Sequence, residues 1–511
     1  MKRTPLFPLP DKKTLAILFL FALLRLSFLF FTSQHYGYFR DELYYLATSE
    51  HLDWGYVDHP PFEAFILAAV RRVLGDSLFA LRLVPALTGA AIVFLAGLMA
   101  YELGGSRFAQ CVAALSTLIM PCFLGSQTFY SMNVFDQFFW AFSLYLVILQ
   151  MKNESFARWI ILGFMLGFGL MNKISVLFLG FGLFVGIMAT PYRRWLLQRG
   201  VWLAGGIAGI MFLPYVVWQF QHDWATTEFM HNASTYKNYP LSPLQFMQGQ
   251  MLEMHPFPVW LAGLYFLFIA KAGRTWRLLG WIYLSILIVF ILQKAKVYYF
   301  APIYPMMFAA GGVIIEAWVA RFSLRGIRST ILVLLAASGL YIAPLAAPIL
   351  PVETVIRYIQ WMNLAPPPSE RNELRGLPQH FADMFGWEEM VQTIAKAWQA
   401  LPPEERSKCA ILVTNYGEAG AIDFFGKRYP LPKAICPHNN YYFWGPGETT
   451  GEVVLTLYGR DTLMQLFDEV TAVGLFTHPY CMAYENNRTI YLCRKPKIPL
   501  SEAWPRLKHF M

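Results

Sequence analysis

The stretch LAILFLFALLRLSFLFFTSQHYGYFRDELYYLA, residues 15–47, joins a long apolar run to a segment rich in aromatic and acidic side chains. A membrane-spanning helix needs roughly 20 mostly apolar residues, and residues 14–32 reach that length with Arg25 as their one charge. The preceding segment is basic, as in a secretory signal, but no small-residue cleavage site follows the apolar run. We therefore expect a retained first span that also acts as a signal anchor. Arg25 would snorkel, pair inside the helix bundle or contact a ligand phosphate.

The composition of the whole chain is that of a membrane protein. Among 511 residues, 56% are hydrophobic and only 14% are charged, whereas soluble domains average about 25% charged residues. The formal net charge of +9 is compatible with nucleic-acid binding. However, the basic residues lie in short clusters between apolar runs, which is typical of membrane topology. We therefore expect membrane lipid, and no nucleic acid, as a partner.

Apolar windows recur along the first two-thirds of the chain and predict about eleven membrane spans. The windows are 14–32, 78–101, 108–126, 134–150, 157–172, 174–190, 201–220, 256–270, 278–293, 297–320 and 329–349. Basic clusters between them, at residues 193–199, 271–277 and 321–328, mark the cytoplasmic side by the positive-inside rule. An odd number of spans then places the C-terminal part on the extracytoplasmic side. The same reasoning makes residues 33–77 and 222–255 outer loops.

Hydropathy falls after the sequence LAPPPSE, residues 364–370. In the part that follows, CAILVTN (409–415) and EVVLTLYG (452–459) are typical of buried strands. WEEMVQTIAKAW (387–398) and DTLMQLFDEV (461–470) have the periodicity of helices. These alternating elements predict a small α/β domain.

The predicted fold class is therefore a polytopic α-helical membrane protein with a small C-terminal α/β domain. We expect a transmembrane domain over residues 1–350 and a soluble extracytoplasmic domain over residues 351–511. Within the soluble domain, NYGEAGAIDFFG, residues 415–426, either forms a turn where helices pack closely or begins a helix at a ligand.

Four of the six cysteines lie in the soluble domain, and their spacing is not that of a zinc site. Cys481 and Cys493 bound the sequence CMAYENNRTIYLC, which is typical of a hairpin. An oxidising compartment permits disulfides, so a bridge between these two cysteines is a hypothesis.

A first acidic motif, RDELYYL, follows the first span on the predicted outer side. Asp41 and Glu42 come where a helix can begin, and negative charge is favoured there by less than about 1 kcal/mol. They are either helix-start residues or candidate catalytic carboxylates, and Arg40 before them is a candidate substrate contact.

A second acidic motif, DHPPFEAF, follows within the same loop. Its double proline ends one helix and begins another, which fixes Asp58 and His59 at a rigid corner. The pair either shapes that corner or faces the same pocket as Asp41, where His59 would contact a phosphate or a metal.

Further polar groups stand at the predicted outer ends of later spans. Asp136 lies at the mouth of an apolar helix, where a carboxylate is costly unless it is hydrated, paired or used, and we favour a functional role. Lys173 lies in a tight outer turn and either snorkels or binds a ligand. Lys296, Tyr298 and Tyr299 offer donors for a lipid phosphate, although tyrosines also anchor helices at membrane interfaces.

The loop 222–255 contains Glu228 and His231, which would share one helix face at a spacing of three, and His255. Carboxylate and imidazole groups bind divalent cations, so these three residues are candidate metal ligands. We expect no other cofactor.

The ordered set YFRDELYYLA, GYVDHPPF, the acidic start of the fourth span, KVYYFAPIYP and HNNYYFWGPG resembles the bacterial PMT-like glycosyltransferases of the GT-C fold. This family is related to the protein O-mannosyltransferases and to the lipid A aminoarabinose transferase. The resemblance covers the membrane region and extends less specifically into the C-terminal part. It implies transfer of a sugar, with inversion, from a polyprenyl-phosphate carrier on the outer face of the membrane.

The resemblance also implies roles for single residues. Asp41 and Glu42 match the catalytic acid-pair motif of the family, with Asp41 as the general base, and Asp136 matches a second acidic position. The related aminoarabinose enzymes have a lysine before their double proline, where this chain has His59. That departure moves phosphate binding toward the later donors, which are Lys173, Lys296, Tyr298 and Tyr299.

The expected function is therefore sugar transfer to a lipid, glycan or protein acceptor at the extracytoplasmic face of a bacterial cytoplasmic membrane. The main alternative is a transporter or flippase for a lipid-linked or polar solute. A transporter would place polar pairs in the middle of spans and often contain inverted repeats. Here the charged groups gather at one predicted face, which favours a transferase.

Overall fold

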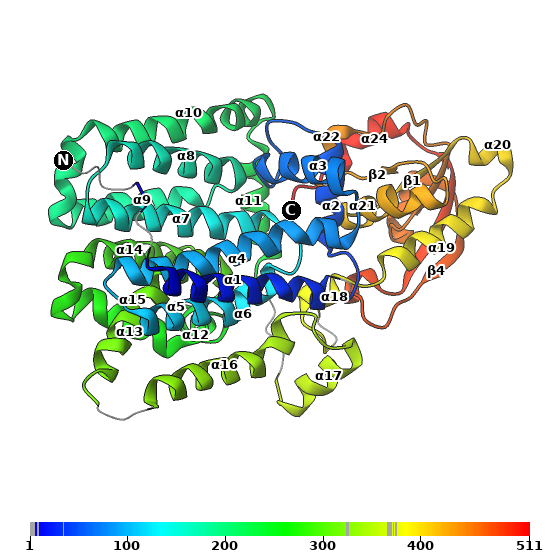
Figure 1. The fold of residues 1–511 in the computed structure, drawn as a ribbon. Coiled ribbons are helices and arrows are strands. Elements are labelled where there is room, and N and C mark those ends of the chain that lie inside the picture. Colours follow the sequence, from blue (N-terminus) through cyan, green and yellow to red (C-terminus); the bar gives the residue numbers. More distant parts are fainter. Residues whose placement is uncertain are drawn as a thin grey trace. The chain divides into compact units, whose positions relative to one another are not determined.

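The computed structural model of the chain describes residues 6–7, 10–33, 35–322, 326–364, 370, 373 and 376–511. Most of these residues are helical, and a small sheet lies in the C-terminal part (Figure 1). The sequence LAPPPSE and the basic cluster 321–328 fall partly outside the described residues, at 365–369 and 323–325.

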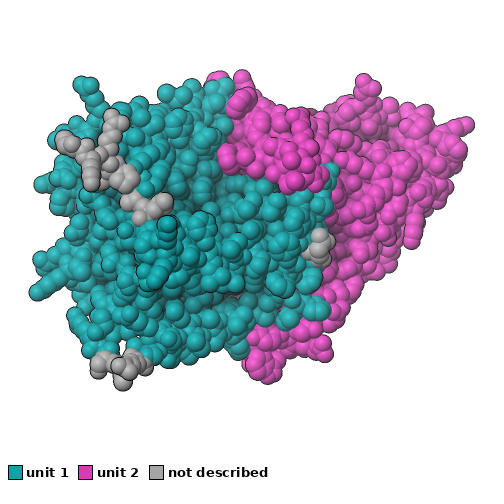
Figure 2. Space-filling model, in the orientation of Figure 1, with its two compact units in different colours: residues 1–35, 76–217, 240–351 teal, residues 36–75, 218–239, 352–511 magenta. Residues whose placement is uncertain are grey.

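The contacts of the chain divide it into two compact units (Figure 2). The first consists of residues 1–35, 76–217 and 240–351, and the second of residues 36–75, 218–239 and 352–511. The second unit thus combines the C-terminal part with segments of both loops that we expect on the outer side.

The first unit is built from helices. They are α1 (Lys12–Thr32), α4 (Leu78–Glu102), α5 (Arg107–Ile119), α6 (Pro121–Ser126), α7 (Met132–Lys152), α8 (Phe156–Asn172), α9 (Val176–Met188), η1 (Pro191–Leu197), α10 (Arg199–Gln221, whose last residues belong to the second unit), α12 (Pro243–Glu253), α13 (Phe257–Phe268), η3 (Lys271–Trp276), α14 (Arg277–Leu292), η4 (Val297–Ile303), α15 (Tyr304–Val319) and α16 (Ile327–Ala346).

Every predicted apolar window contains one or more of these helices, which confirms a multi-pass helical membrane protein. Among the described residues, seven helices are long and apolar enough to span a membrane, or eight if the bent pair α9 and η1 counts as one span. Three further apolar helices, α5, α8 and α13, are shorter than a full span. The total of eleven spans therefore stays a prediction.

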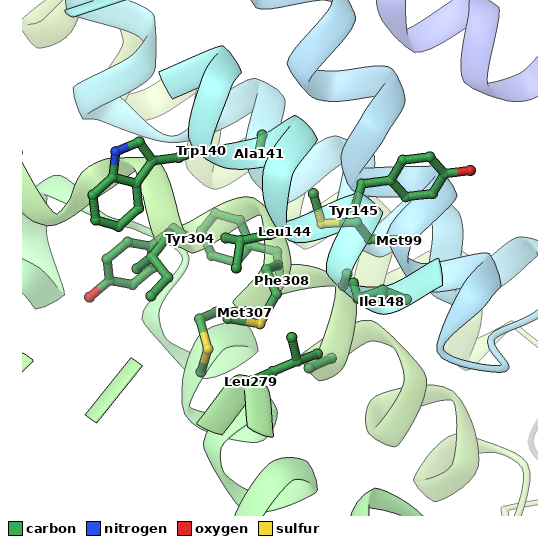
Figure 3. Packing of buried hydrophobic residues seen from close by; sticks show 14 of the residues in the cluster. Met99, Trp140, Ala141, Leu144, Tyr145, Ile148, Leu279, Tyr304, Met307 and Phe308 are labelled. Carbon is green, nitrogen blue, oxygen red and sulfur yellow. The ribbon is translucent and has the colours of Figure 1, made fainter. Parts of the chain in front are cut away.

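The core of the first unit lies along α7 and α15. Trp140, Leu144 and Ile148 follow one another at the four-residue spacing of a helix face, and all are buried with Tyr304 and Met307 (Figure 3). The apolar windows of α7 and α15 are 78% buried, whereas those of α1, α10 and α16 are 22% buried. The exposed apolar side chains of these last three helices require lipid around them.

Arg25 of α1 is buried, and its partners lie inside the helix bundle. Its Nε donates to Gln127 Oε1 at 2.9 Å, and Gln127 in turn donates to Gln137 at 2.8 Å. A methyl group on Gly89 would overlap Gln127 Oε1, so glycine makes room for this network. Of the alternatives for Arg25, the structure supports pairing within the bundle.

Two glycines allow α13 and α15 to pack at close range. A methyl group on Gly311 would overlap the carbonyl oxygen of Val259, and one on Gly263 would overlap the carbonyl oxygen of Met307. We expect Gly311→Ala to destabilise the protein by roughly 1–3 kcal/mol, because the helices must move apart. Gly209→Ala in α10 is the matched control, since nothing lies within 4 Å of the added methyl group. Thermal unfolding in detergent checks this, and equal melting temperatures for the two variants would contradict it.

The second unit contains short helices and one sheet. Its elements are α2 (Arg40–Glu50), α3 (Phe62–Leu74), α11 (Ala225–Asn232), η2 (Ala233–Lys237), α17 (Val352–Trp361), α18 (Gln379–Ala382), α19 (Trp387–Gln399), α20 (Pro403–Arg406), β1 (Cys409–Leu412), α21 (Tyr416–Phe425), η5 (Gly426–Arg428), β2 (Ala434–Ile435), α22 (Asn440–Trp444), β3 (Val453–Thr456), α23 (Arg460–Leu466), β4 (Phe467–Phe476), η6 (Ala483–Glu485), β5 (Arg488–Pro496) and α24 (Leu500–Leu507).

The sheet is mixed and has the strand order β2-β1-β3-β5-β4. β1 runs parallel to β2 and β3, and β5 runs antiparallel to β3 and β4. The predicted strands in CAILVTN and EVVLTLYG are confirmed as β1 and β3, and the predicted helix WEEMVQTIAKAW is confirmed as α19. The predicted helix over DTLMQLFDEV is only partly confirmed. The helix α23 ends at Leu466, and the remaining FDEV belongs to β4, which pairs with β5.

The hypothesis of a Cys481–Cys493 disulfide is wrong in this structure, where neither cysteine forms a disulfide. Phe476, the last residue of β4, pairs with Arg488 at the start of β5, so Cys481 lies in the connecting loop. Cys493 lies five residues further along β5, opposite Val470. At about 3.4 Å per residue, that is roughly 17 Å along the strand, too far for a bridge.

Candidate functional site

Asp41 lies in the first turn of α2, in the second unit. Its Oδ1 accepts a hydrogen bond from the Tyr416 hydroxyl at 2.9 Å and lies 3.5 Å from Arg40 Nε. Its Oδ2 has no hydrogen-bond or ion-pair partner among the residues that the structure describes. The side chain is 30% exposed. One carboxylate oxygen is therefore held, and the other is available to a ligand.

Arg40 precedes Asp41 and is engaged within the protein. Its NH1 donates to the Tyr484 hydroxyl at 2.5 Å and lies 3.8 Å from Asp383 Oδ1. Burial raises the pKa of Asp383 to about 6 even though Arg40 lowers it. The Arg40 guanidinium thus contacts the side chains of Asp41, Asp383 and Tyr484. Its role as a substrate contact stays a prediction.

Glu42 does not form an equivalent pair with Asp41, which differs from the sequence expectation. The side chain is fully buried, and its Oε2 accepts a hydrogen bond from the backbone N–H of Phe39 at 2.9 Å. This bond satisfies one of the free N–H groups at the start of α2. Glu42 therefore stabilises the helix start that carries Asp41, and it is not open to a ligand.

Asp58 and His59 lie together at the corner that the double proline creates. The Tyr44 hydroxyl donates to Asp58 Oδ1 at 2.9 Å, and His59 Nε2 lies 3.8 Å from the same oxygen. His59 Nδ1 lies 3.2 Å from Glu63 Oε1 and 3.0 Å from the carbonyl oxygen of Pro60. Both neighbours of Nδ1 are acceptors, so this nitrogen carries a proton.

Electrostatics make His59 a cation at neutral pH. Burial disfavours its charged form, but the carboxylates of Glu63 and Asp58 outweigh burial and raise the pKa of His59 to about 9. The pKa of Asp58 is raised by burial and by the nearby Asp41, although His59 lowers it. His59 therefore supplies positive charge where the related family has a lysine, but its side chain is fully buried among its partners.

A second group of predicted residues lies in the first unit. Asp136, near the start of α7, is buried, and the Ser175 hydroxyl donates to its Oδ1 at 2.8 Å. Lys173, just after α8, lies 3.9 Å from Asp136 Oδ2 and donates to Asn133 Oδ1 at 2.7 Å. The chain thus places a cation beside Asp136 at the ends of two apolar helices, which offsets the cost of burying a carboxylate there.

The aromatic pair of the KVYY segment adjoins this lysine. Lys173 Nζ lies 4.8 Å from the ring centre of Tyr299 and 5.7 Å from that of Tyr298. Both tyrosines belong to η4, and Lys296 immediately precedes it. The structure therefore brings Asp136, Lys173 and both tyrosines together, and their role in phosphate binding stays a prediction.

The structure does not gather Glu228, His231 and His255 into a metal site. Within its described part, no group of three or more His, Cys, Asp or Glu side chains is arranged to hold a metal ion. Glu228 instead pairs with Lys508 at 2.8 Å, and His255 Nε2 contacts the Ser338 hydroxyl at 2.9 Å. Glu228 and His255 therefore make contacts other than the predicted metal coordination.

Residues from the C-terminal part contact Asp41 and its neighbour Arg40, and the sequence analysis did not select them. Tyr416 donates to Asp41, whereas Asp383 and Tyr484 contact Arg40. The available signal was Gly417 and Gly420 of NYGEAGAIDFFG, a segment that forms the helix α21 rather than a turn. A methyl group on Gly420 would come within 2.6 Å of the Leu43 carbonyl oxygen, so glycine lets α21 approach α2 closely.

Comparisons with known proteins agree with this architecture. Residues 58–218 match the family model described as dolichyl-phosphate-mannose-protein mannosyltransferase. The lipid A galacturonosyltransferase RgtD of Rhizobium johnstonii is 24% identical over 269 residues, which cover 51% of this chain and 56% of that protein. The chain thus aligns with little more than half the length of this curated relative.

Solved structures with a similar fold include ArnT from Cupriavidus metallidurans. The crystal structure of ArnT bound to undecaprenyl phosphate matches with a TM-score of 0.61 and 15% identity, covering 94% of this chain and 98% of ArnT. The apo structure matches with the same score and identity over 93% and 97% of the two chains. Residues 58–218 of the chain thus resemble the mannosyltransferase family model, and the chain has the fold of ArnT.

Proposed function

We propose that the chain is a membrane glycosyltransferase that uses a polyprenyl-phosphate-linked sugar as donor. It would transfer the sugar, with inversion, to a lipid, glycan or protein acceptor on the extracytoplasmic face of a bacterial cytoplasmic membrane. The observation that carries this proposal is the partly exposed Asp41 carboxylate, with one oxygen held by Tyr416 and the other without a partner among the described residues. A positioned carboxylate of this kind is what a general base needs.

The chemistry requires little beyond this base. The acceptor hydroxyl would give its proton to Asp41 Oδ2 while its oxygen bonds to the anomeric carbon of the sugar. The bond from that carbon to the phosphate oxygen breaks on the opposite face, and polyprenyl phosphate leaves with the bonding electrons. A phosphate leaving group needs positive charge or donors rather than a general acid, which Lys173 with Tyr298 and Tyr299 would supply.

The relatives support the classes of donor and acceptor to test first. The name of the Rhizobium relative gives lipid A as acceptor, and the ArnT structure contains undecaprenyl phosphate. We therefore propose an undecaprenyl-phosphate sugar as donor and lipid A as the first acceptor to examine.

The direct test is donor consumption by the purified full-length chain in detergent. Labelled undecaprenyl-phosphate hexose, pentose and uronic acid are each incubated with lipid A, and released undecaprenyl phosphate is measured. We expect acceptor-dependent release from one of the three donors. Movement of intact donor across proteoliposomes without release of undecaprenyl phosphate would instead indicate a flippase.

Lys173 provides a separate test of phosphate binding. Lys173→Met should raise KM for the donor by about tenfold or more, because the variant lacks the cation held beside Tyr299. Lys271→Met, in η3 between two predicted spans on the cytoplasmic side, is the control and should leave KM unchanged. Steady-state kinetics check this, and an unchanged donor KM in Lys173→Met would remove Lys173 from the donor site.

A further inference from the structure

Tyr416, the first residue of α21, has a hydroxyl group that donates a hydrogen bond to Asp41. The bond runs to Oδ1 at 2.9 Å across 375 positions of sequence, and the residue is 6% exposed. A phenylalanine would fill the same space, so the hydroxyl is the feature that packing alone does not require.

The Tyr416 ring is held on several sides within the second unit. Its centre lies 4.7 Å from the ring centre of Tyr44 and 4.9 Å from that of His438. The Arg40 guanidinium carbon lies 5.4 Å from the same ring centre. These contacts leave the ring little freedom, so the hydroxyl has a fixed position relative to α2.

The backbone that carries Tyr416 is equally well fixed. Asn415 caps α21, and its Oδ1 accepts from the N–H groups of Gly417 at 2.9 Å and Glu418 at 3.1 Å. Glu418 Oε2 accepts in return from the N–H group of Asn415 at 3.3 Å. Such a reciprocal cap sets the direction in which the first helical residue leaves the turn.

The hydroxyl is a donor at every working pH. Burial raises the pKa of Tyr416 well above its usual value, and the nearby carboxylates of Asp41 and Asp58 add to this while Arg40 opposes it. A hydroxyl that stays protonated, with an anionic oxygen 2.9 Å away, donates to that oxygen.

We propose that Tyr416 is a positioning residue that binds Asp41 Oδ1 and thereby orients Oδ2 toward the acceptor hydroxyl. This inference rests on the proposed function of Asp41 as general base. It gives the C-terminal part of the chain a direct role in catalysis, because its helix α21 would fix the base that α2 carries.

The test compares Tyr416→Phe with Tyr441→Phe in the full-length protein. Tyr441 is a matched control, since its hydroxyl also donates to a carboxylate, Asp423, at 2.9 Å from a buried ring. We expect Tyr416→Phe to lower kcat about tenfold with donor KM within twofold of wild type. Tyr441→Phe should change neither kcat nor donor KM.

A kinetic comparison separates this inference from the proposed function. If Asp41→Asn is inactive while Tyr416→Phe has the wild-type kcat, the positioning role is wrong and the proposed base stands. If Asp41→Asn is as active as wild type, the proposed base is wrong and the positioning role falls with it.

A stability measurement tests the hydrogen bond without any activity. Tyr416→Phe should lower the melting temperature less in an Asp41→Ala background than in the wild-type background, because its partner is already missing. An equal loss in both backgrounds would mean that the two side chains are not coupled, which would overturn the inference even if the kinetic variants were poorly active.

Discussion

Asp41→Asn is expected to lower the rate of sugar transfer by about 10²–10⁴-fold while the protein folds normally. The asparagine keeps an oxygen that can accept from the Tyr416 hydroxyl, so the packing between α2 and α21 is preserved. It cannot accept a proton from an acceptor hydroxyl, and the loss should therefore appear in kcat rather than in donor KM.

Asp53→Asn is the appropriate control for this experiment. Asp53 lies in the same loop and is exposed, and its carboxylate accepts from the Trp218 indole at 2.7 Å, a bond that asparagine can also accept. We expect wild-type turnover for this variant, measured as release of undecaprenyl phosphate. Turnover of Asp41→Asn within a fewfold of the control would exclude Asp41 as the base and direct attention to Asp136.

Asp136 is a weaker candidate on physical grounds. Its Oδ1 accepts from Ser175, Lys173 stands near Oδ2, and the side chain is almost fully buried. A carboxylate paired and buried in this way is poorly exposed to a substrate. We therefore propose that Asp136 positions Lys173, the lysine proposed to bind phosphate.

Local patterns in the sequence predicted the helical membrane region and most of the small sheet. Apolar windows report burial in lipid or protein directly, and each window contains helix in the structure. The pattern failed at DTLMQLFDEV, where a helical repeat continues into residues of β4. Because β4 lies at the edge of the sheet and is partly exposed, its sequence does not alternate cleanly between apolar and polar residues.

The surroundings of the candidate residues were harder to predict because they depend on distant segments. Asp41 could be selected from its position after the first span, but its partner Tyr416 is 375 positions away. Glu42 has the same charge as its neighbour, yet the turn of α2 directs it into the protein, where it meets the Phe39 N–H. Adjacent residues on a helix point about 100° apart, so two carboxylates in sequence need not share a site.

His59 shows how such surroundings can change the chemistry of a residue. The sequence comparison led us to expect a lysine before the double proline, and histidine at its usual pKa is mostly neutral at pH 7. Glu63 and Asp58 raise the pKa of His59 to about 9, so this histidine carries the charge of a lysine at neutral pH.

The stability of the protein should therefore fall as the pH rises from about 6.5 to 9. The pKa of His59 is higher in the folded state than in the unfolded state, so its contribution is complete below the unfolded pKa and is lost above the folded one. A shift of this size corresponds to about 3 kcal/mol at neutral pH. We expect the melting temperature of the wild type to decline across this range, measured at constant ionic strength in detergent.

Two variants of His59 distinguish the ion pair from ordinary packing. His59→Gln leaves the fully buried Glu63 without its cation and should destabilise the protein by roughly 3–5 kcal/mol at pH 7, with a flatter alkaline profile. His59→Lys retains a cation to higher pH and should hold the melting temperature nearly constant through pH 9, provided that its longer chain reaches the same carboxylate. His51→Gln is the control, because burial lowers the pKa of His51 and its loss should leave the alkaline decline in place. An alkaline decline that persists unchanged in His59→Gln would show that His59 is neutral, and that the positive charge at this corner must come from another residue.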